Sequence, residues 1–157
     1  MKAPIYLLAA VMLLAASCGD SNNKGPEYLF VQTSNGATLT DSTLTLTGIS
    51  PQTGWFTDRP YREAGQIPTE EFLTLWDEGE NSFADDPPNA DFTCTIDGEV
   101  VNYVVELTMP ELVGNELTYG ARAIGDAKST SVATVCPHAS IFIDFNVGWG
   151  GVRSSNL

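Results

Sequence analysis

Hydrophobic and polar residues alternate with a period of two along several short segments of this chain. Leu44 and Leu46, for example, alternate with Thr43, Thr45 and Thr47. Such alternation is typical of a β-strand with one buried face. On this pattern, and on their β-branched and aromatic content, we predict strands over residues 28–34, 37–49, 91–96, 99–108, 116–124 and 140–145. On strand 99–108 one face carries Val101, Tyr103, Val105 and Leu107.

Dipeptides that favour turns separate these segments. The Asn-Gly pair at 35–36 and the Asp-Gly pair at 97–98 each predict a tight hairpin between two strands. Residues 109–115 contain Pro110 and Gly114 and predict a further turn.

One segment follows a helical period instead. Thr69 is a good N-cap and two glutamates follow it, which suits the first turn of a helix. Phe72, Leu75 and Trp76 then share one apolar face, and Gly79 is placed to end the helix after about eight to ten residues. Short strands joined by turns, with one helix, predict a mainly β fold, either an antiparallel β-sandwich or a small barrel with one short α-helix. We expect it to form a single β-rich domain over residues 28–157.

The N-terminus has the pattern of an export signal. Residues 1–17 combine a basic start, a short apolar run and small residues before Cys18. The apolar run is shorter than the roughly 20 residues that span a bilayer. The sequence LAASC at 14–18 resembles the lipobox of bacterial lipoproteins. That resemblance implies that Cys18 is lipidated, that residues 18–27 form a tether, and that the protein is anchored to a membrane of the cell envelope, periplasmic or at the cell surface.

The cysteine count fits an exported chain. There are three cysteines, and if Cys18 carries lipid, Cys94 and Cys136 remain as a pair. Disulfides persist in oxidising compartments, so we predict a bridge between these two residues.

Charge narrows the range of partners. The chain has 7 basic and 20 acidic residues, and loss of the signal with Lys2 would leave a net charge of −14. Nucleic acids require a basic surface, so we predict no nucleic-acid partner.

Residues 77–91 concentrate oxygen ligands. Calcium takes six to eight oxygens from carboxylates, amides and carbonyls. The candidate ligands are Asp77, Glu80, Asn81, Asp85, Asp86, Asn89 and Asp91. The spacing is not that of an EF-hand, so the same loop also fits a solvated turn.

A second cluster combines aromatic, acidic and basic side chains. It consists of Trp55, Asp58, Arg59, Tyr61 and Arg62. Arginine can bind a carboxylate in a bidentate manner or stack on a ring. The cluster fits a binding surface for a protein or carbohydrate partner, and equally a structural turn.

No motif in the chain specifies a reaction. There is one histidine, His138, and no G-x-S-x-G sequence, so a serine or cysteine triad has little support. The stretches FTDRPYREAG, TEEF and SFADDPPNAD resemble small exported proteins of unassigned function, over residues 44–107, and this resemblance implies no activity. We therefore predict a cell-envelope lipoprotein that is a non-enzymatic binding or structural module, with calcium as its candidate ion. The alternatives are a small exported hydrolase that uses carboxylates, and an accessory subunit of an envelope or extracellular assembly.

Overall fold

The computed structural model describes residues 26–77, 82–124 and 134–145. The predicted signal segment 1–17, Cys18 and most of the predicted tether lie outside these residues, as do Glu80 and Asn81. The strands are β1 (Tyr28–Leu39), β2 (Thr43–Ile49), β3 (Gln52–Thr57), β4 (Ala64–Pro68), β5 (Asn89–Ile96), β6 (Glu99–Val113), β7 (Glu116–Ala123), β8 (Thr134–Cys136) and β9 (Ala139–Phe145). Helix α1 (Thr69–Leu73) continues into the 3₁₀ turn η1 (Thr74–Trp76).

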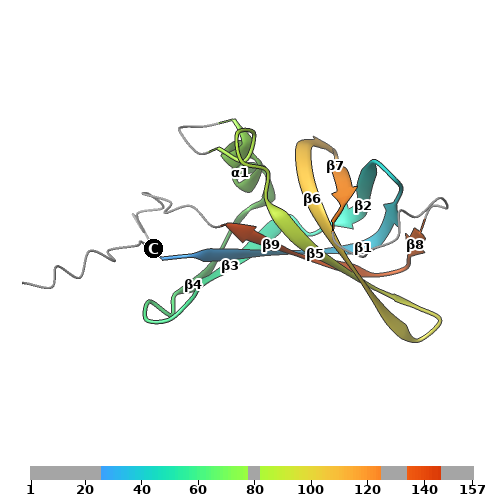
Figure 1. Cartoon of the computed structure of the whole chain (residues 1–157), viewed down its shortest axis with the longest axis horizontal. Coiled ribbons are helices and arrows are strands. Elements are labelled where there is room, and N and C mark those ends of the chain that lie inside the picture. Colours follow the sequence, from blue (N-terminus) through green and yellow to red (C-terminus); the bar gives the residue numbers. More distant parts are fainter. Residues whose placement is uncertain (1–25, 78–81, 125–133, 146–157) are drawn as a thin grey trace, which may run out of the picture.

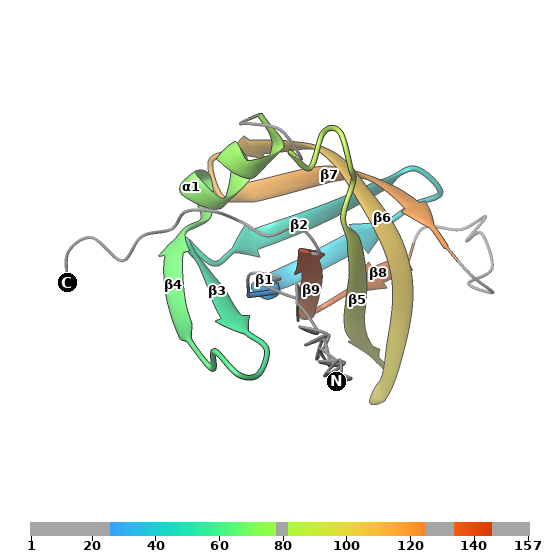
Figure 2. The same cartoon turned by 60° about the vertical axis from the view of Figure 1, so that its left-hand side comes forward.

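Six strands close an antiparallel barrel in the order β1, β2, β7, β6, β5, β9 and back to β1 (Figure 1, Figure 2). Strand β1 makes this closure possible because its two halves have different neighbours. Residues 28–31 lie between β9 and β3, whereas residues 37–39 lie between β2 and β8. The prediction of a mainly β, antiparallel fold with one short helix is confirmed, and of its two alternatives the barrel is the one formed.

The barrel interior follows the alternation that the sequence predicted. Leu44 and Leu46 are buried, while the threonines between and beside them are more exposed. On β6, Val105 and Leu107 are fully buried on the predicted face.

The hairpin predicted at Asn35 and Gly36 is wrong, because β1 continues through both residues. A hairpin turn of that kind needs positive φ angles, and neither residue has one. Instead, the alternation of buried and exposed residues shifts by one position there: even-numbered residues are buried up to Ser34, and odd-numbered residues are buried from Ala37 on. Gly48, opposite on β2, has a φ of +63°, and a Cβ on it would lie 2.7 Å from the Asn35 side-chain nitrogen. The Asn-Gly pair therefore marks a bend in two paired strands.

The β5–β6 hairpin at Asp97 and Gly98 is confirmed, with positive φ angles of 52° and 84°. The turn predicted over 109–115 is wrong for most of its length, because β6 continues to Val113. Its register with β7 shifts between Thr108 and Glu111, so this stretch is a bulge. Pro110 lacks a backbone N–H, and a bulge is a place where a strand tolerates proline.

Helix α1 presents its aromatic face to the barrel interior. Phe72 and Trp76 are buried as predicted, and Leu75 is half-buried. Thr69 is not the N-cap, however: Pro68 holds that position, and the Thr69 hydroxyl instead donates to the Ser50 carbonyl oxygen over 2.9 Å. The predicted end at Gly79 lies outside the described residues.

Aromatic rings join the helix to the barrel. The Phe72 ring lies 4.9 Å from that of Phe30, and the Trp76 ring lies 5.6 Å from that of Tyr119. Phe83, just after the helix, lies 4.6 Å from Trp76 and packs edge-on against Phe145 at 4.9 Å. The helix and residue 83 thus fill one end of the barrel with aromatic side chains.

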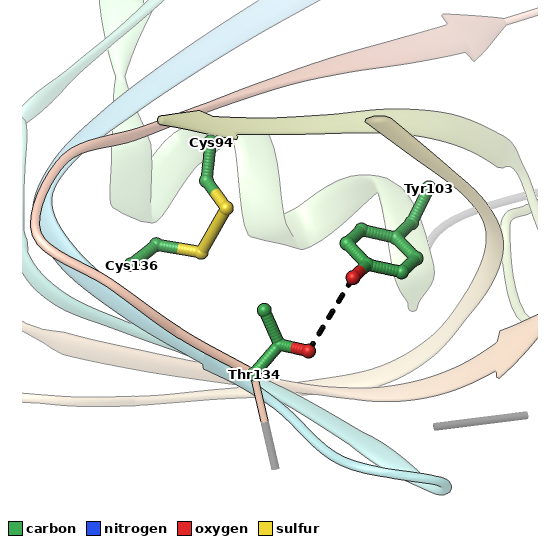
Figure 3. The surroundings of a disulfide bond; sticks show 4 residues. All are labelled: Cys94, Tyr103, Thr134 and Cys136. Carbon is green, nitrogen blue, oxygen red and sulfur yellow. Dashed lines mark hydrogen bonds between the residues drawn. A yellow bond between two sulfur atoms is a disulfide. The ribbon is translucent and has the colours of Figure 1, made fainter. Parts of the chain in front are cut away.

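The predicted Cys94–Cys136 disulfide is confirmed (Figure 3). It joins β5 to β8, with the two Cα atoms 5.7 Å apart and both residues buried. Beside it, the Tyr103 hydroxyl of β6 bonds the Thr134 hydroxyl of β8 over 3.4 Å. The short strand β8 is therefore held by a covalent bond and a side-chain hydrogen bond.

Candidate functional site

A chain of buried hydrogen bonds connects the centre of the barrel to the start of the helix. The Tyr119 hydroxyl donates to Gln32 Oε1 over 2.7 Å, and Gln32 Nε2 donates to Thr53 Oγ1 over 3.1 Å. Thr53 in turn bonds Thr69 over 3.0 Å. All four side chains are buried. Burial raises the pKa of Tyr119, which keeps its hydroxyl protonated as a donor. This series of hydrogen bonds therefore fixes where α1 begins relative to β1, β3 and β7.

Replacing Tyr119 with phenylalanine should leave Gln32 Oε1 buried without its donor. We expect a loss of about 1–3 kcal/mol in the free energy of unfolding. Urea denaturation measures this loss. The matched control is Tyr103→Phe, which removes a half-buried hydroxyl with a longer bond of 3.4 Å and should cost less. Equal losses for the two substitutions would contradict the stabilising role given to the buried hydrogen bonds.

A groove lies beside the helix, between α1–η1, residues 83–84 and the bulge of β6. Its volume is about 660 Å³, which falls in the range of small-molecule pockets. The apolar residues that line it are Leu73, Trp76, Phe83, Ala84, Met109 and Pro110. The polar residues that line it are Glu70, Thr74, Asp77 and Thr108. We call this site the helix groove.

The bulge gives the helix groove an unusual wall. Met109 has a φ of +41° and is 80 % exposed. Non-glycine residues rarely adopt a positive φ, and local strain of this kind is concentrated at functional sites. A large, flexible apolar side chain is thus held at the edge of the groove, in a conformation that the chain would not adopt without support from its surroundings.

Trp76 supplies an unused hydrogen-bond donor. The residue is 3 % exposed, and its indole Nε1 is buried without a hydrogen-bond partner. A buried donor left unpaired costs about 1–3 kcal/mol. Trp76 also lines the helix groove, but its indole nitrogen is closed to solvent and is not offered to a ligand there.

The charge around the groove has one sign. Glu70 and Asp77 are exposed carboxylates, and none of the described residues that line the groove is a lysine, arginine or histidine. The whole chain carries a net charge of −13. The electrostatic potential at the groove therefore favours a neutral or cationic ligand over an anionic one.

The structure separates the predicted calcium ligands. Asp77 follows η1 as its C-cap and lines the helix groove. Asp85 and Asp86 are exposed in a turn, and the backbone N–H groups of both donate to the Ser82 carbonyl oxygen. Asn89 and Asp91 belong to β5. Among residues 26–77, 82–124 and 134–145, no three His, Cys, Asp or Glu side chains are grouped closely enough to hold a metal ion. Glu80 and Asn81 lie outside these ranges, so calcium in this loop stays a prediction.

The second predicted cluster lies on the β3–β4 hairpin. Trp55 is half-buried and packs edge-on against Tyr28, with ring centroids 5.8 Å apart. Asp58, Arg59, Tyr61 and Arg62 are exposed at the hairpin tip. The Arg62 N–H donates to the Asp58 carbonyl oxygen over 3.1 Å, and the structure shows no ion pair between the Asp58 carboxylate and either arginine. The hairpin tip thus groups the four residues on an exposed surface, and the binding surface proposed for them stays a prediction.

Sequence reasoning did not predict the helix groove. Thr108, Met109 and Pro110 were assigned to a turn, and the groove depends on their position in a bulged strand beside a helix more than thirty residues earlier. The adjacent Met and Pro inside an alternating strand are the local signal that could have indicated a bulge.

Comparisons with known proteins add no assignment. No family model matches the chain, and neither the curated proteins nor the solved structures contain a match. None of the helices in the described part of the chain has the length and apolar character needed to cross a membrane.

Proposed function

We propose that this chain is an exported, lipid-anchored, non-enzymatic binding module that holds a small ligand with an apolar body in the helix groove. The observation that carries the proposal is the groove itself, a cavity of about 660 Å³ with six apolar and four polar lining residues. Pockets that bind small molecules combine apolar walls with a few placed polar groups in this way.

The groove also suggests the chemistry of the ligand. An alkyl or ring body would cover Leu73, Ala84 and Met109. A neutral or cationic head group would lie near Glu70 and Asp77 without repulsion.

The location of the module is proposed on separate grounds. The lipobox-like LAASC at 14–18 supports lipid anchoring at Cys18, and a buried disulfide suits an oxidising compartment. Calcium and the carboxylate-dependent hydrolase remain predictions from the sequence, as does the accessory-subunit alternative.

Three ligands that share one ten-carbon chain test the proposal: decanol, decyltrimethylammonium and decanoate, titrated below the concentrations at which they aggregate. We expect decanol and the cation to bind and to raise the melting temperature. When the free ligand is about 100 times Kd, binding should add about 2.7 kcal/mol to the free energy of unfolding. Decanoate should bind more weakly at low ionic strength. The double variant Glu70→Gln and Asp77→Asn should remove this charge preference while keeping affinity for decanol.

A substitution that fills the groove provides the control for location. Ala84 is exposed and lines the groove, so Ala84→Trp should lower the affinity for decanol by at least about tenfold, or 1.4 kcal/mol. Ala64→Trp places the same side chain on an exposed position of β4 outside the groove and should leave affinity unchanged. Absence of binding by all three ligands, or equal binding by both tryptophan variants, would refute the proposed site.

A further inference from the structure

A second cavity adjoins the helix groove at the start of α1. Its volume is about 480 Å³, and Glu70 lines both cavities. The rest of its lining comes from the turn between β2 and β3, the start of α1, and the end of β6 with the turn that follows. These residues are Ile49, Ser50, Pro51, Pro68, Thr69, Leu112, Gly114 and Asn115. We call this cavity the turn cavity.

The two cavities follow each other along one seam between the helix and β6. On the helical side, residues between 70 and 77 line the helix groove, and residues 68–70 line the turn cavity. On the strand side, residues 108–110 line the groove, and residues 112, 114 and 115 line the turn cavity. Both walls therefore pass from one cavity to the other at the same place, beside Glu70. The helix groove and the turn cavity together form one trough.

The turn cavity presents a mainly apolar surface, because several of its polar groups are bonded within the protein. The Thr69 hydroxyl donates to the Ser50 carbonyl oxygen over 2.9 Å. The Ile49 N–H donates to the Asn115 carbonyl oxygen over 3.0 Å. The apolar side chains that line the cavity are Ile49, Pro51, Pro68 and Leu112.

The charged groups of the trough lie toward its other end. Asp77 and Glu70 line the helix groove, whereas the described residues of the turn cavity other than Glu70 carry no charge. A polar head group loses its hydration in an apolar cavity, and a carbon chain does not. A ligand with both parts therefore places its head near Asp77 and its tail beyond Glu70.

The length of the trough sets the size of the ligand. The helical wall from Glu70 to Asp77 is roughly 11 Å long. An extended ten-carbon chain is about equally long, because its C–C bonds are about 1.5 Å. The strand wall from Thr108 to Gly114 is roughly 17–20 Å long at about 3.3 Å per residue. A chain that fills the whole trough therefore has about 14–16 carbons.

We infer that the trough binds a single-chain amphiphile with about 14–16 carbons and a neutral or cationic head group. The head group lies near Asp77, and the tail passes Glu70 and ends against Ile49 and Leu112. This inference rests on the proposed function, because it names the class of ligand that the helix groove holds. It adds that the groove holds only part of that ligand.

Alkyltrimethylammonium ions of ten, twelve and fourteen carbons test the inference by titration calorimetry of the full chain, below the concentrations at which they aggregate. Affinity should rise about fourfold with each added CH₂, because each one is buried in the trough. The fourteen-carbon ion should thus bind roughly 200-fold more tightly than the ten-carbon ion. A gain of less than about tenfold would overturn the inference. Failure of both the ten-carbon ion and decanol to bind would instead refute the proposed function itself.

Two substitutions show where the added carbons lie. Asn115→Trp and Pro51→Trp each place a large ring at an exposed position that lines the turn cavity and not the groove. Either one should lower the affinity for the fourteen-carbon ion by at least about tenfold and leave the affinity for the ten-carbon ion unchanged. Asn102→Trp is the control, because Asn102 is exposed on β6 and lines neither cavity. Fourteen-carbon binding that stays at the wild-type affinity in a folded Asn115→Trp or Pro51→Trp variant would overturn the inference and leave the proposed function in place.

Discussion

Replacing Phe72 with alanine is expected to destabilise the fold by about 3–5 kcal/mol. Phe72 is fully buried, and its ring contacts those of Phe30, Trp76 and Phe83. The substitution removes the transfer free energy of the ring and leaves a cavity between helix and barrel. Since small domains are stable by only about 5–15 kcal/mol, the loss is a large fraction of the total.

Urea denaturation of Phe72→Ala measures this loss, with the midpoint and slope fitted separately. Phe56→Ala is the matched control, because Phe56 is 42 % exposed on β3. Its truncation should lower the free energy of unfolding by much less than that of the buried Phe72. Phe72→Ala should also weaken binding of decanol, since Leu73 and Trp76 of the same helical segment line the groove. Equal losses in the two variants would show that the helix does not pack into the barrel as described.

Removal of the disulfide should have the second large effect. The bond joins residues 42 positions apart, and in the chain-entropy account a loop of that size adds about 3–4 kcal/mol of stability. The double variant Cys94→Ala and Cys136→Ala should lose that amount relative to the oxidised protein. Strand β8 should loosen first, because it pairs with β1 over only three residues.

Denaturation with and without a reducing agent provides the internal control. The reductant should destabilise the wild-type protein and leave the double variant unchanged. A wild-type protein whose unfolding midpoint is the same in both conditions would contradict the contribution assigned to the disulfide.

The sequence was most informative where a pattern depends on neighbouring residues. Alternation predicted the buried faces of β2 and β6, and the Asp-Gly pair at 97–98 predicted a hairpin, because its positive φ angles are a local property. The pairing of Cys94 with Cys136 followed from counting, since lipidation of Cys18 would leave only those two thiols.

The errors arose where tertiary context outweighs a local preference. The Asn-Gly pair at 35–36 is a hairpin signal by composition, yet the barrel uses it for a bend because β2 carries Gly48 opposite. Thr69 is a good N-cap in isolation, but its hydroxyl bonds Ser50 and Thr53 in the buried chain. The choice between sandwich and barrel depended on the pairing of β1 with both β2 and β9, which alternation alone does not specify.

The helix groove depends on the same kind of long-range information. It combines residues from separate segments of the chain, at 70–77, 83–84 and 108–110.

The most direct test of the helix groove uses the methyl group of Met109. The chain has three methionines, and Met109 lines the groove while Met1 and Met12 belong to the N-terminal segment. With methionine methyl groups labelled with carbon-13, addition of decanol should shift the Met109 signal in proportion to occupancy. In Ala84→Trp the same shift should require at least about ten times more decanol. A Met109 signal that stays constant while decanol binds to the wild-type protein would place the ligand elsewhere and contradict the account.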